Sequence, residues 1–414
     1  MGTSGGDQAV LDPRDLVDGS VLEEPTAWFH RLLDTAPVWR VPGRDLVVVS
    51  SFDTVTEAVR RPDDFSSNIR SVIYRDDDGW PALVSLGFDD GASSIDVLAT
   101  ADPPMHKGHR SMVLHELIAA KVAALRPTIE ALARARVADA VAAGSFDAMA
   151  AIANPIPIRV VSRLVGFVDD DPDDLLAAAF DSTALLAATQ PVEVALEAMA
   201  RAAAILDWIG AEVDRAIADG ADGILDLAAQ AVRAGELDRD SAVVMMHTLL
   251  SAGGESTTSL LGNAMWALAN DRPLQDRLRA DRELLPAFLE EVLRLDSPFR
   301  YHLRYARQAT VLDGVEVPAG AVVVLLWAAA NRDPRRFEDP DDLRLDRAFP
   351  RDHVGFGRGI HLCVGAPLAR LEAEIVLGAL IDATTSIEPG DLPPERVNSL
   401  MIRRFETLPL TIVP

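Results

Sequence analysis

The chain has 414 residues, of which 49% are hydrophobic and 25% charged, a composition typical of a globular protein with a large buried core. Sixty-four acidic side chains against 39 basic ones give a net charge of -25, which argues against nucleic acid or an anionic membrane as the main partner. The first ten residues resemble no signal peptide and no run of about eighteen apolar residues follows, so a cytoplasmic protein without membrane spans is expected.

No Gly/Ser-rich or Pro-rich linker and no repeat divides the sequence. We therefore expect one domain over residues 21–414, preceded by a flexible segment over residues 1–20. Alternating apolar patterns predict strands, and Ala-rich segments with apolar residues three and four apart predict helices, so the fold is expected to be mainly α with a small β region. The strands are expected at 38–40, 46–50, 322–326 and 408–413, and helices at 117–143, 173–188 and 193–219.

A histidine-rich segment precedes these helices. His106 and Arg110 are four residues apart, which places them on one face of a helix. A metal site formed by His106, His109 and His115 is an alternative. Their spacing is only loosely co-facial, however, and no acidic partner of the HExxH type is present, so the metal site is the weaker interpretation.

The longest predicted helix begins at Asp240 or Ser241 and ends near Asn270. At 1.5 Å per residue it would be about 45 Å long and would cross the whole molecule. Gly253 and Gly254 in its middle each cost about 1 kcal/mol relative to alanine. Two explanations stay open: a kinked core helix, or a flattened helix face against which a planar cofactor lies.

An acid and a base follow this helix. Glu291 and Arg294 lie one helical turn apart, where they can form an ion pair. Pairs at this spacing are common, so the spacing alone assigns no function. A chain break at Pro298 and a strand-like run over 315–324 come next.

The single cysteine, Cys363, lies in the glycine-rich segment FGRGIHLCVG at 356–365. One thiol excludes an internal disulfide and a multi-cysteine zinc site, and leaves a buried filler, a nucleophile or a single metal ligand. Gly357 and Gly359 are expected to adopt positive φ and to let a flat ligand approach the backbone. A helix is predicted to begin just after the sulfur, so its amides favour a thiolate, whereas no Cys-His-Asn set supports a nucleophile. These features favour the metal ligand.

The cysteine segment resembles the Phe-x-x-Gly-x-x-x-Cys-x-Gly haem loop of the cytochrome P450 family, in its soluble bacterial form, at every defining position. Residues 252–257 are similar to that family's Ala-Gly-x-Glu-Thr-Thr oxygen-binding segment, with Ser256 in place of the usual threonine. The resemblance implies a single-domain fold in which the long helix crosses over haem b. It also implies a monooxygenase that inserts one atom of dioxygen into an apolar small organic molecule, with a separate ferredoxin and ferredoxin reductase as electron donors. We expect a monomer.

The resemblance further implies roles for individual residues. Cys363 would bind the iron, and Glu255 with Ser256 or Thr257 would deliver protons. A buried network of Glu291, Arg294 and Arg347 would hold the cysteine loop. The haem would contact Ala252, Gly253, Phe356, Gly357 and Gly365, and its propionates would pair with His106, Arg110, Arg304 and His361. The substrate cavity would be lined by Thr248, Ser251, Arg300, Tyr301, Leu303, Leu400 and Met401, and by the loop around 83–98.

Two further hypotheses rest on charged side chains. A cation beside an apolar cavity is expensive unless it is paired, so Arg300 either binds a substrate carboxylate or phenolate or points outward into a salt bridge. A local basic patch on an acidic protein would steer an acidic ferredoxin to the sulfur side. The patch would consist of Lys107, Arg110, Arg358 and Arg370.

Two alternative functions stay open: a peroxide-driven oxidase and a haem-binding sensor that has lost catalysis.

Overall fold

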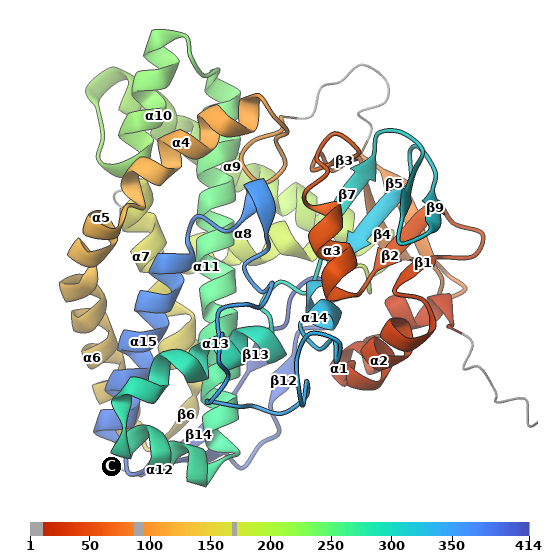
Figure 1. The fold of residues 1–414 in the computed structure, drawn as a ribbon. Helices are drawn as coiled ribbons and strands as arrows, with labels where there is room; N and C mark the ends of the chain where they lie inside the picture. The colour runs from red at the N-terminus through yellow and green to blue at the C-terminus, as the bar shows by residue number, and fades with distance from the viewer. Residues whose placement is uncertain (1–10, 87–94, 168–171, 414) are drawn as a thin grey trace, which may run out of the picture.

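The computed structural model describes residues 11–86, 95–167 and 172–413. Long helices gather on one side of the molecule, and a small sheet with short helices lies on the other (Figure 1). This arrangement confirms the prediction of a mainly α fold with a small β region. The helices are α1 Gly19–Glu23, α2 Thr26–Thr35, α3 Phe52–Ala58, α4 Met105–Glu116, α5 Ala119–Ala124, α6 Arg126–Ala143, α7 Pro155–Val165, α8 Pro172–Ala184, α9 Val192–Asp219, α10 Gly223–Ala234, α11 Arg239–Ala269, α12 Arg272–Ala280, α13 Leu285–Leu295, α14 Trp327–Ala330 and α15 Ala366–Ala383.

The largest sheet in the described residues has the strand order β1-β2-β10-β7-β3. β10 runs parallel to β2 and antiparallel to β7, so segments from both ends of the chain meet in this sheet. A smaller sheet has the order β11-β14-β6, and the remaining strands form hairpins. The strands are β1 Val38–Arg40, β2 Leu46–Val49, β3 Phe65–Ser66, β4 Ser71–Arg75, β5 Pro81–Ser85, β6 Ser145–Asp147, β7 His302–Ala306, β8 Thr310–Leu312, β9 Val315–Val317, β10 Val322–Leu325, β11 Ser386–Pro389, β12 Glu395–Arg396, β13 Phe405–Thr407 and β14 Pro409–Val413.

Two predicted elements are interrupted in the structure. The helix expected over 117–143 is divided into α5 and α6 at Leu125. Pro127, in the first turn of α6, has no N–H to continue a helix through this point. The strand-like run over 315–324 is likewise two strands, β9 and β10, separated by a turn in which Gly320 has a φ of 84°.

The N-terminal region differs from the prediction. Residues 1–10 lie outside the described residues. From Leu11 onward the chain is packed: Asp12 caps a short 3-10 helix over Pro13–Leu16, and Leu16 and Val17 are completely buried. A flexible segment extending to residue 20 is therefore wrong for residues 11–20, because their apolar side chains enter the core. The extent of a single domain over 21–414 stays a prediction.

Helix α11 runs without interruption through the middle of the molecule (Figure 1). It begins slightly earlier than predicted, because Asp238 accepts a hydrogen bond from the Ser241 amide at 2.7 Å and caps the helix. The two glycines remain in α-helical geometry, so the helix is not broken at them. A Cβ on Gly253 would lie 2.7 Å from Cγ2 of Val161 in α7, and one on Gly254 would lie 3.0 Å from Cδ1 of Ile158.

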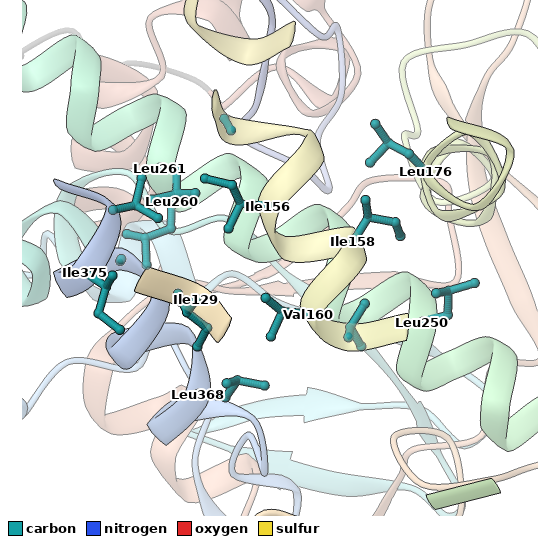
Figure 2. Packing of buried hydrophobic residues seen from close by; sticks show 14 of the residues in the cluster. Ile129, Ile156, Ile158, Val160, Leu176, Leu250, Leu260, Leu261, Leu368 and Ile375 are labelled. Carbon is teal, nitrogen blue, oxygen red and sulfur yellow. The ribbon is translucent and has the colours of Figure 1, made fainter. Parts of the chain in front are cut away.

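The glycine pair therefore allows α7 to lie against α11. Figure 2 shows this contact, with Ile156, Ile158 and Val160 of α7 beside α11 and Leu250 among the buried side chains around it. The core that surrounds these helices also includes α6 and α15. Along the described part of the chain, no helix combines the length and apolar character needed to cross a bilayer.

Candidate active site

The cysteine segment and the middle of α11 enclose a cavity of about 250 Å³. Other walls come from α4, β7 and the first turn of α15. Four stretches that are far apart in the sequence thus contribute predicted site residues to one cavity. These residues are His106, Arg110, Thr248, Ala252, Gly253, Ser256, Thr257, Arg304, Phe356, Gly357, His361, Cys363 and Gly365.

The backbone around Cys363 is closed by one hydrogen bond. The Cys363 amide donates to the Phe356 carbonyl at 2.9 Å, and α15 begins three residues after the sulfur, as predicted. Gly357 and Gly359 have φ angles of 68° and 75°, which confirms the positive φ expected from the sequence. A Cβ at Gly359 would also lie 2.9 Å from the Val59 carbonyl oxygen, so this turn has no room for a side chain.

The charge state of Cys363 depends on more than the helix that follows. The backbone amides of Gly365 and Ala366 and the Arg110 guanidinium favour the thiolate, but burial outweighs them and raises the pKa of the thiol. The helix amides therefore do not hold a thiolate by themselves. A bound metal cation would supply the missing positive charge, since a coordinated thiol is deprotonated. The sulfur is free and opens into the cavity, as a metal ligand must.

Four basic side chains gather on one side of the cavity. The rings of His106 and His361 lie 4.2 Å apart, and Arg110 donates from Nη2 to the Leu362 carbonyl at 2.7 Å. Burial lowers the pKa of His361 to about 3 and that of Arg304 to about 10. Among the described residues, neither arginine has a carboxylate within ion-pair distance.

These observations test whether haem fits the cavity. The buried or half-buried guanidinium groups of Arg304 and Arg110 are costly without acidic partners, and two carboxylates such as haem propionates would neutralise them, with the two histidines as further hydrogen-bonding groups. A single accessible thiol would supply one ligand to the haem iron. The residues present therefore fit the group.

The alternative histidine site finds no support. His106 faces His361, His115 lies 3.2 Å from Glu116, and the buried Nδ1 of His109 has no hydrogen-bond partner in the described structure. Within residues 11–86, 95–167 and 172–413, no group of three or more His, Cys, Asp or Glu side chains is arranged to hold a metal ion.

Both candidate proton-relay hydroxyls line the cavity, but their contacts differ. Ser256 donates from Oγ to the Ala252 carbonyl at 2.6 Å, one helical turn earlier. The Thr257 hydroxyl has no hydrogen-bond partner among the described residues. Thr248 also lines the cavity and bonds back to the Val244 carbonyl at 2.7 Å. The cavity face of α11 thus carries hydroxyls directly beside Ala252.

Glu255 does not line the cavity and is only 1% exposed. Its carboxylate accepts a hydrogen bond from Thr183 and one from Nε of Arg404 at 3.2 Å. Burial nevertheless raises the pKa of Glu255 to about 7, against the opposing effects of Arg404 and Thr183. Its catalytic role stays a prediction. Ser251 also faces away and donates to Ser182 at 3.0 Å, so its assignment as a cavity-lining residue is wrong.

The predicted substrate contacts after α13 are largely wrong. Phe299, His302 and Arg304 line the cavity, whereas Arg300, Tyr301 and Leu303 do not. Within β7 the side chains alternate between two faces, so Leu303 turns away from the cavity that His302 and Arg304 line. Residues 299–301 precede the strand and do not follow this alternation. Tyr301 donates its hydroxyl to the Leu186 carbonyl at 2.6 Å. Leu400 and Met401, also predicted as lining residues, pack with Tyr301 and Leu303 in a separate core cluster.

Arg300 contradicts both hypotheses made for it. It does not reach the active-site cavity, and it does not point outward, because it is only 3% exposed. Its Nη1 donates to the Leu22 carbonyl at 2.9 Å, and it lines a second cavity.

The structure adds site residues that the sequence reasoning missed. His302 accepts a hydrogen bond from the Trp327 indole at 2.7 Å, and the alternation along β7 is the signal that could have found it. Glu372 lines the cavity from α15, where burial raises its pKa well above the usual range. No sequence signal distinguished it. Of the predicted loop over 83–98, Leu98 lines the cavity, and residues 87–94 lie outside the described residues.

The three residues of the predicted ion network are in contact in the structure. Glu291 pairs with Arg294 at 2.7 Å and with Arg347 at 2.9 Å, and it also accepts the Arg344 amide at 2.9 Å. Arg294 further donates to backbone carbonyls, including that of Asn331 at 3.0 Å. The three predicted side chains therefore join α13 to the segment that leads into the cysteine loop.

The predicted basic patch is smaller than expected. Arg370 pairs with Glu290 at 2.6 Å, and Arg358 pairs with Asp352 at 2.8 Å. Arg110 turns into the cavity, so Lys107 is the exposed member whose charge has no ion-pair partner in the described structure.

Comparisons with known proteins agree with this geometry. The family model for Cytochrome P450 matches residues 204–402. The chain is 41% identical to Cytochrome P450 144 of Mycobacterium tuberculosis over 94% of its length and 89% of that protein. It is 30% identical to the Beta-dihydromenaquinone-9 omega-hydroxylase of the same species, over 97% of the chain and 78% of the relative.

A solved structure extends the likeness to the fold. The crystal structure of CYP109E1 from Bacillus megaterium in complex with testosterone superimposes with a TM-score of 0.82 at 26% identity, covering 95% of this chain and 99% of the other. The similarity spans nearly all of this chain, in which Cys363 and the four basic side chains line one cavity beside α11. The chain therefore belongs to the cytochrome P450 family and is a haem-iron monooxygenase, an oxidoreductase.

Proposed function

We propose that this protein binds haem b through Cys363 and inserts one atom of dioxygen into an apolar small organic molecule, with electrons from a ferredoxin and its reductase. The observation that carries the proposal is that the single thiol, four basic side chains and the Ala252 face of α11 open into the same cavity. Each of these three features would answer one need of a haem monooxygenase: a ligand for the iron, partners for the propionates and open space beside the cofactor.

The cofactor, when bound, would supply the activation of dioxygen. Cys363 would hold the iron as thiolate, and His106, Arg110, Arg304 and His361 would pair with the propionates. On the opposite side, the small side chain of Ala252 leaves room between α11 and the cofactor.

Proton delivery would be the main chemical task of the protein. The Ser256 hydroxyl, which already bonds to the Ala252 carbonyl, is placed to hold a water in the cavity and to pass a proton to it. Glu255 would be the proton source behind it, since its pKa of about 7 keeps it partly protonated near neutrality. For this, its carboxyl has to leave Arg404. Thr257 is the second candidate for the relay.

An apolar substrate is supported by the cavity walls. Apart from the basic cluster, the lining consists mainly of aliphatic and aromatic side chains, which favour burial of an apolar molecule. A relative named for hydroxylating dihydromenaquinone and a neighbour bound to testosterone both act on or bind molecules of this character. The lining includes Leu98, Val161, Leu164, Leu249, Leu293 and Phe299.

The proposal is tested by the reduced carbon monoxide spectrum of the purified protein beside that of Cys363→Ser. The wild type is expected to show the long-wavelength band of a thiolate-ligated haem, and the variant to lose that band or the haem itself. The same band in both proteins would contradict ligation by Cys363.

The source of electrons that supports turnover distinguishes the proposed monooxygenase from the two alternative functions. Turnover with ferredoxin, reductase and NADPH supports the proposal. Equal turnover with hydrogen peroxide alone would indicate a peroxide-driven oxidase. A ligand-induced spin shift without product under full reducing conditions would indicate a sensor.

A further inference from the structure

A second cavity, of about 400 Å³, is lined by four arginines and is called here the arginine cavity. The segment 296–300 separates it from the active site. Pro298 and Phe299 line the active-site cavity, whereas Asp296, Ser297 and Arg300 line the arginine cavity. The four arginines are Arg300, Arg332, Arg396 and Arg403.

Arg300 is the most deeply buried of these side chains, at 3% exposure. Its backbone is fixed on both sides, because its amide donates to Met401 and its carbonyl accepts from Ala328. Its guanidinium makes one hydrogen bond, from Nη1 to the Leu22 carbonyl. Among the described residues, its Nε and Nη2 have no partner and no carboxylate lies within ion-pair distance. A buried guanidinium stays charged and is costly without an acceptor.

The carboxylates near Arg300 are already close to the other arginines of the cavity. Asp296 is 3.1 Å from Arg403, and the exposed Glu23 is 3.9 Å from Arg396. The arginines around Asp296 hold the pKa of its carboxyl at about 2, which shows how strongly positive this region is.

Arg332 also lines the cavity, but its charge is paired elsewhere. Its Nη1 is bound to Asp341 at 2.7 Å, and its Nη2 donates to the Leu295 carbonyl at 3.1 Å. Among the described residues, Arg300 is therefore the one arginine of this cavity without a carboxylate partner.

We propose that the arginine cavity binds a small polyatomic oxyanion, namely phosphate or the phosphate group of a phosphomonoester, through Arg300 together with Arg396 and Arg403. Planar guanidinium groups bind phosphate through paired hydrogen bonds, and several of them are needed to neutralise a dianion. An apolar ligand would leave the donors unpaired, and a cation would be repelled. Glu23 and Glu24 also line the cavity, but both are exposed, so water screens their repulsion.

The test is calorimetric titration of the haem-loaded protein with sodium phosphate and, separately, with glycerol 3-phosphate, at constant ionic strength. Saturable binding is expected for the wild type. Binding of either compound supports the site, and the compound that binds more tightly tells a free phosphate from a phosphomonoester. An absence of saturable heat with either compound up to millimolar concentrations overturns the proposal.

Variants locate the binding. Arg300→Met is expected to weaken binding by about tenfold or more, since it removes charge-assisted hydrogen bonds. Arg396→Gln serves as a second variant where Arg300→Met does not fold. Glu23→Gln should tighten binding, whereas Arg201→Gln, a surface arginine paired with Asp181 far from the cavity lining, should leave it unchanged. Wild-type affinity in both Arg300→Met and Arg396→Gln overturns the proposal. Because the readout is heat, it does not depend on monooxygenase activity.

Discussion

Ser256, the hydroxyl that we propose for the proton relay, lines the cavity and lacks the methyl group with which a threonine would restrict its rotamer. Ser256→Ala should still bind haem, but product formed per NADPH should fall by about tenfold or more, because the proton-donating group is lost. The missing electrons should appear as hydrogen peroxide.

Measuring NADPH oxidation, product and peroxide together checks this expectation. Ser256→Thr is the matched control and should couple at least as well as the wild type. Tight coupling in Ser256→Ala would assign the relay to Thr257.

The pKa of Glu255 makes stability depend on pH. Its pKa of about 7 in the folded protein lies above its ordinary value of 4.5, so the folded state binds this proton more tightly than the unfolded state. The associated stabilisation is fully present below pH 4.5 and is lost as the pH rises through about 7.

Glu255→Gln, which cannot ionise, removes this dependence. Relative to the variant, the wild type should lose about 3 kcal/mol between about pH 4 and pH 8, as an upper limit for a buried pair. Urea unfolding of both proteins at several pH values measures the difference. Parallel pH profiles would show that Arg404 keeps the carboxylate ionised throughout.

Residues around the cofactor could be predicted from the sequence where a contiguous motif contains them. Cys363 and Gly357 are such cases, and both open into the cavity. The resemblance implied that Tyr301 and Leu303 line the cavity, whereas the alternation of side chains along β7 turns Leu303 away from it and Tyr301 precedes the strand. The partner of Glu255, Arg404, lies 149 positions away and could not be read from local sequence.

At the scale of elements, the close approach of α7 and α11 depends on Gly253. In Gly253→Ala the new Cβ would lie 2.7 Å from Val161 Cγ2, so one of the two helices has to shift. We expect a net loss of about 1–3 kcal/mol despite the better helix propensity of alanine.

Chemical denaturation of Gly253→Ala, Val161→Ala and the double variant tests this packing. The double variant should recover part of the loss, because the side chain that clashes is shortened. Gly108→Ala in α4 is the matched control. No atom would contact its Cβ within 4 Å, so it should stabilise the protein by about 0.5–1 kcal/mol. Independent effects of the two core substitutions would contradict the packing argument.

Helices were predictable from periodicity, but their interruptions were less so. The break before Pro127 is a local effect that closer attention to proline would have found. The role of Gly253 and Gly254 could not be predicted in this way, because it depends on Val161 and Ile158, which belong to another helix.

At the scale of the whole molecule, Glu291 connects the helical part to the segment before the cysteine loop. Arg347, held by Glu291, also donates to the carbonyls of Glu338 and Asp339. Glu291→Ala should cost about 3–5 kcal/mol, since it leaves buried arginines without their carboxylate. Little haem-loaded protein is expected.

Haem content and urea unfolding measure these losses. Glu338→Ala is the control, because the Glu338 side chain is 81% exposed in its pair with Arg344 and should contribute less than about 1 kcal/mol. Normal haem loading of Glu291→Ala would refute a structural role for the network.

The overall fold followed from the resemblance carried by two short motifs, whereas the arginine cavity did not follow from any pattern. Its walls come from α1 and the chain after it, the end of α13, and the hairpin of β12 and β13. Charged side chains that are scattered in sequence give no periodic signal, so only the packed chain shows that they converge.

The alternation along β7 has a practical meaning for protein engineering. His302 and Arg304 line the active-site cavity, while Leu303 between them packs with the N-terminal helices in a separate core cluster. The cavity wall can therefore be altered at His302 while the scaffold contact of Leu303 on the other side of the strand is kept.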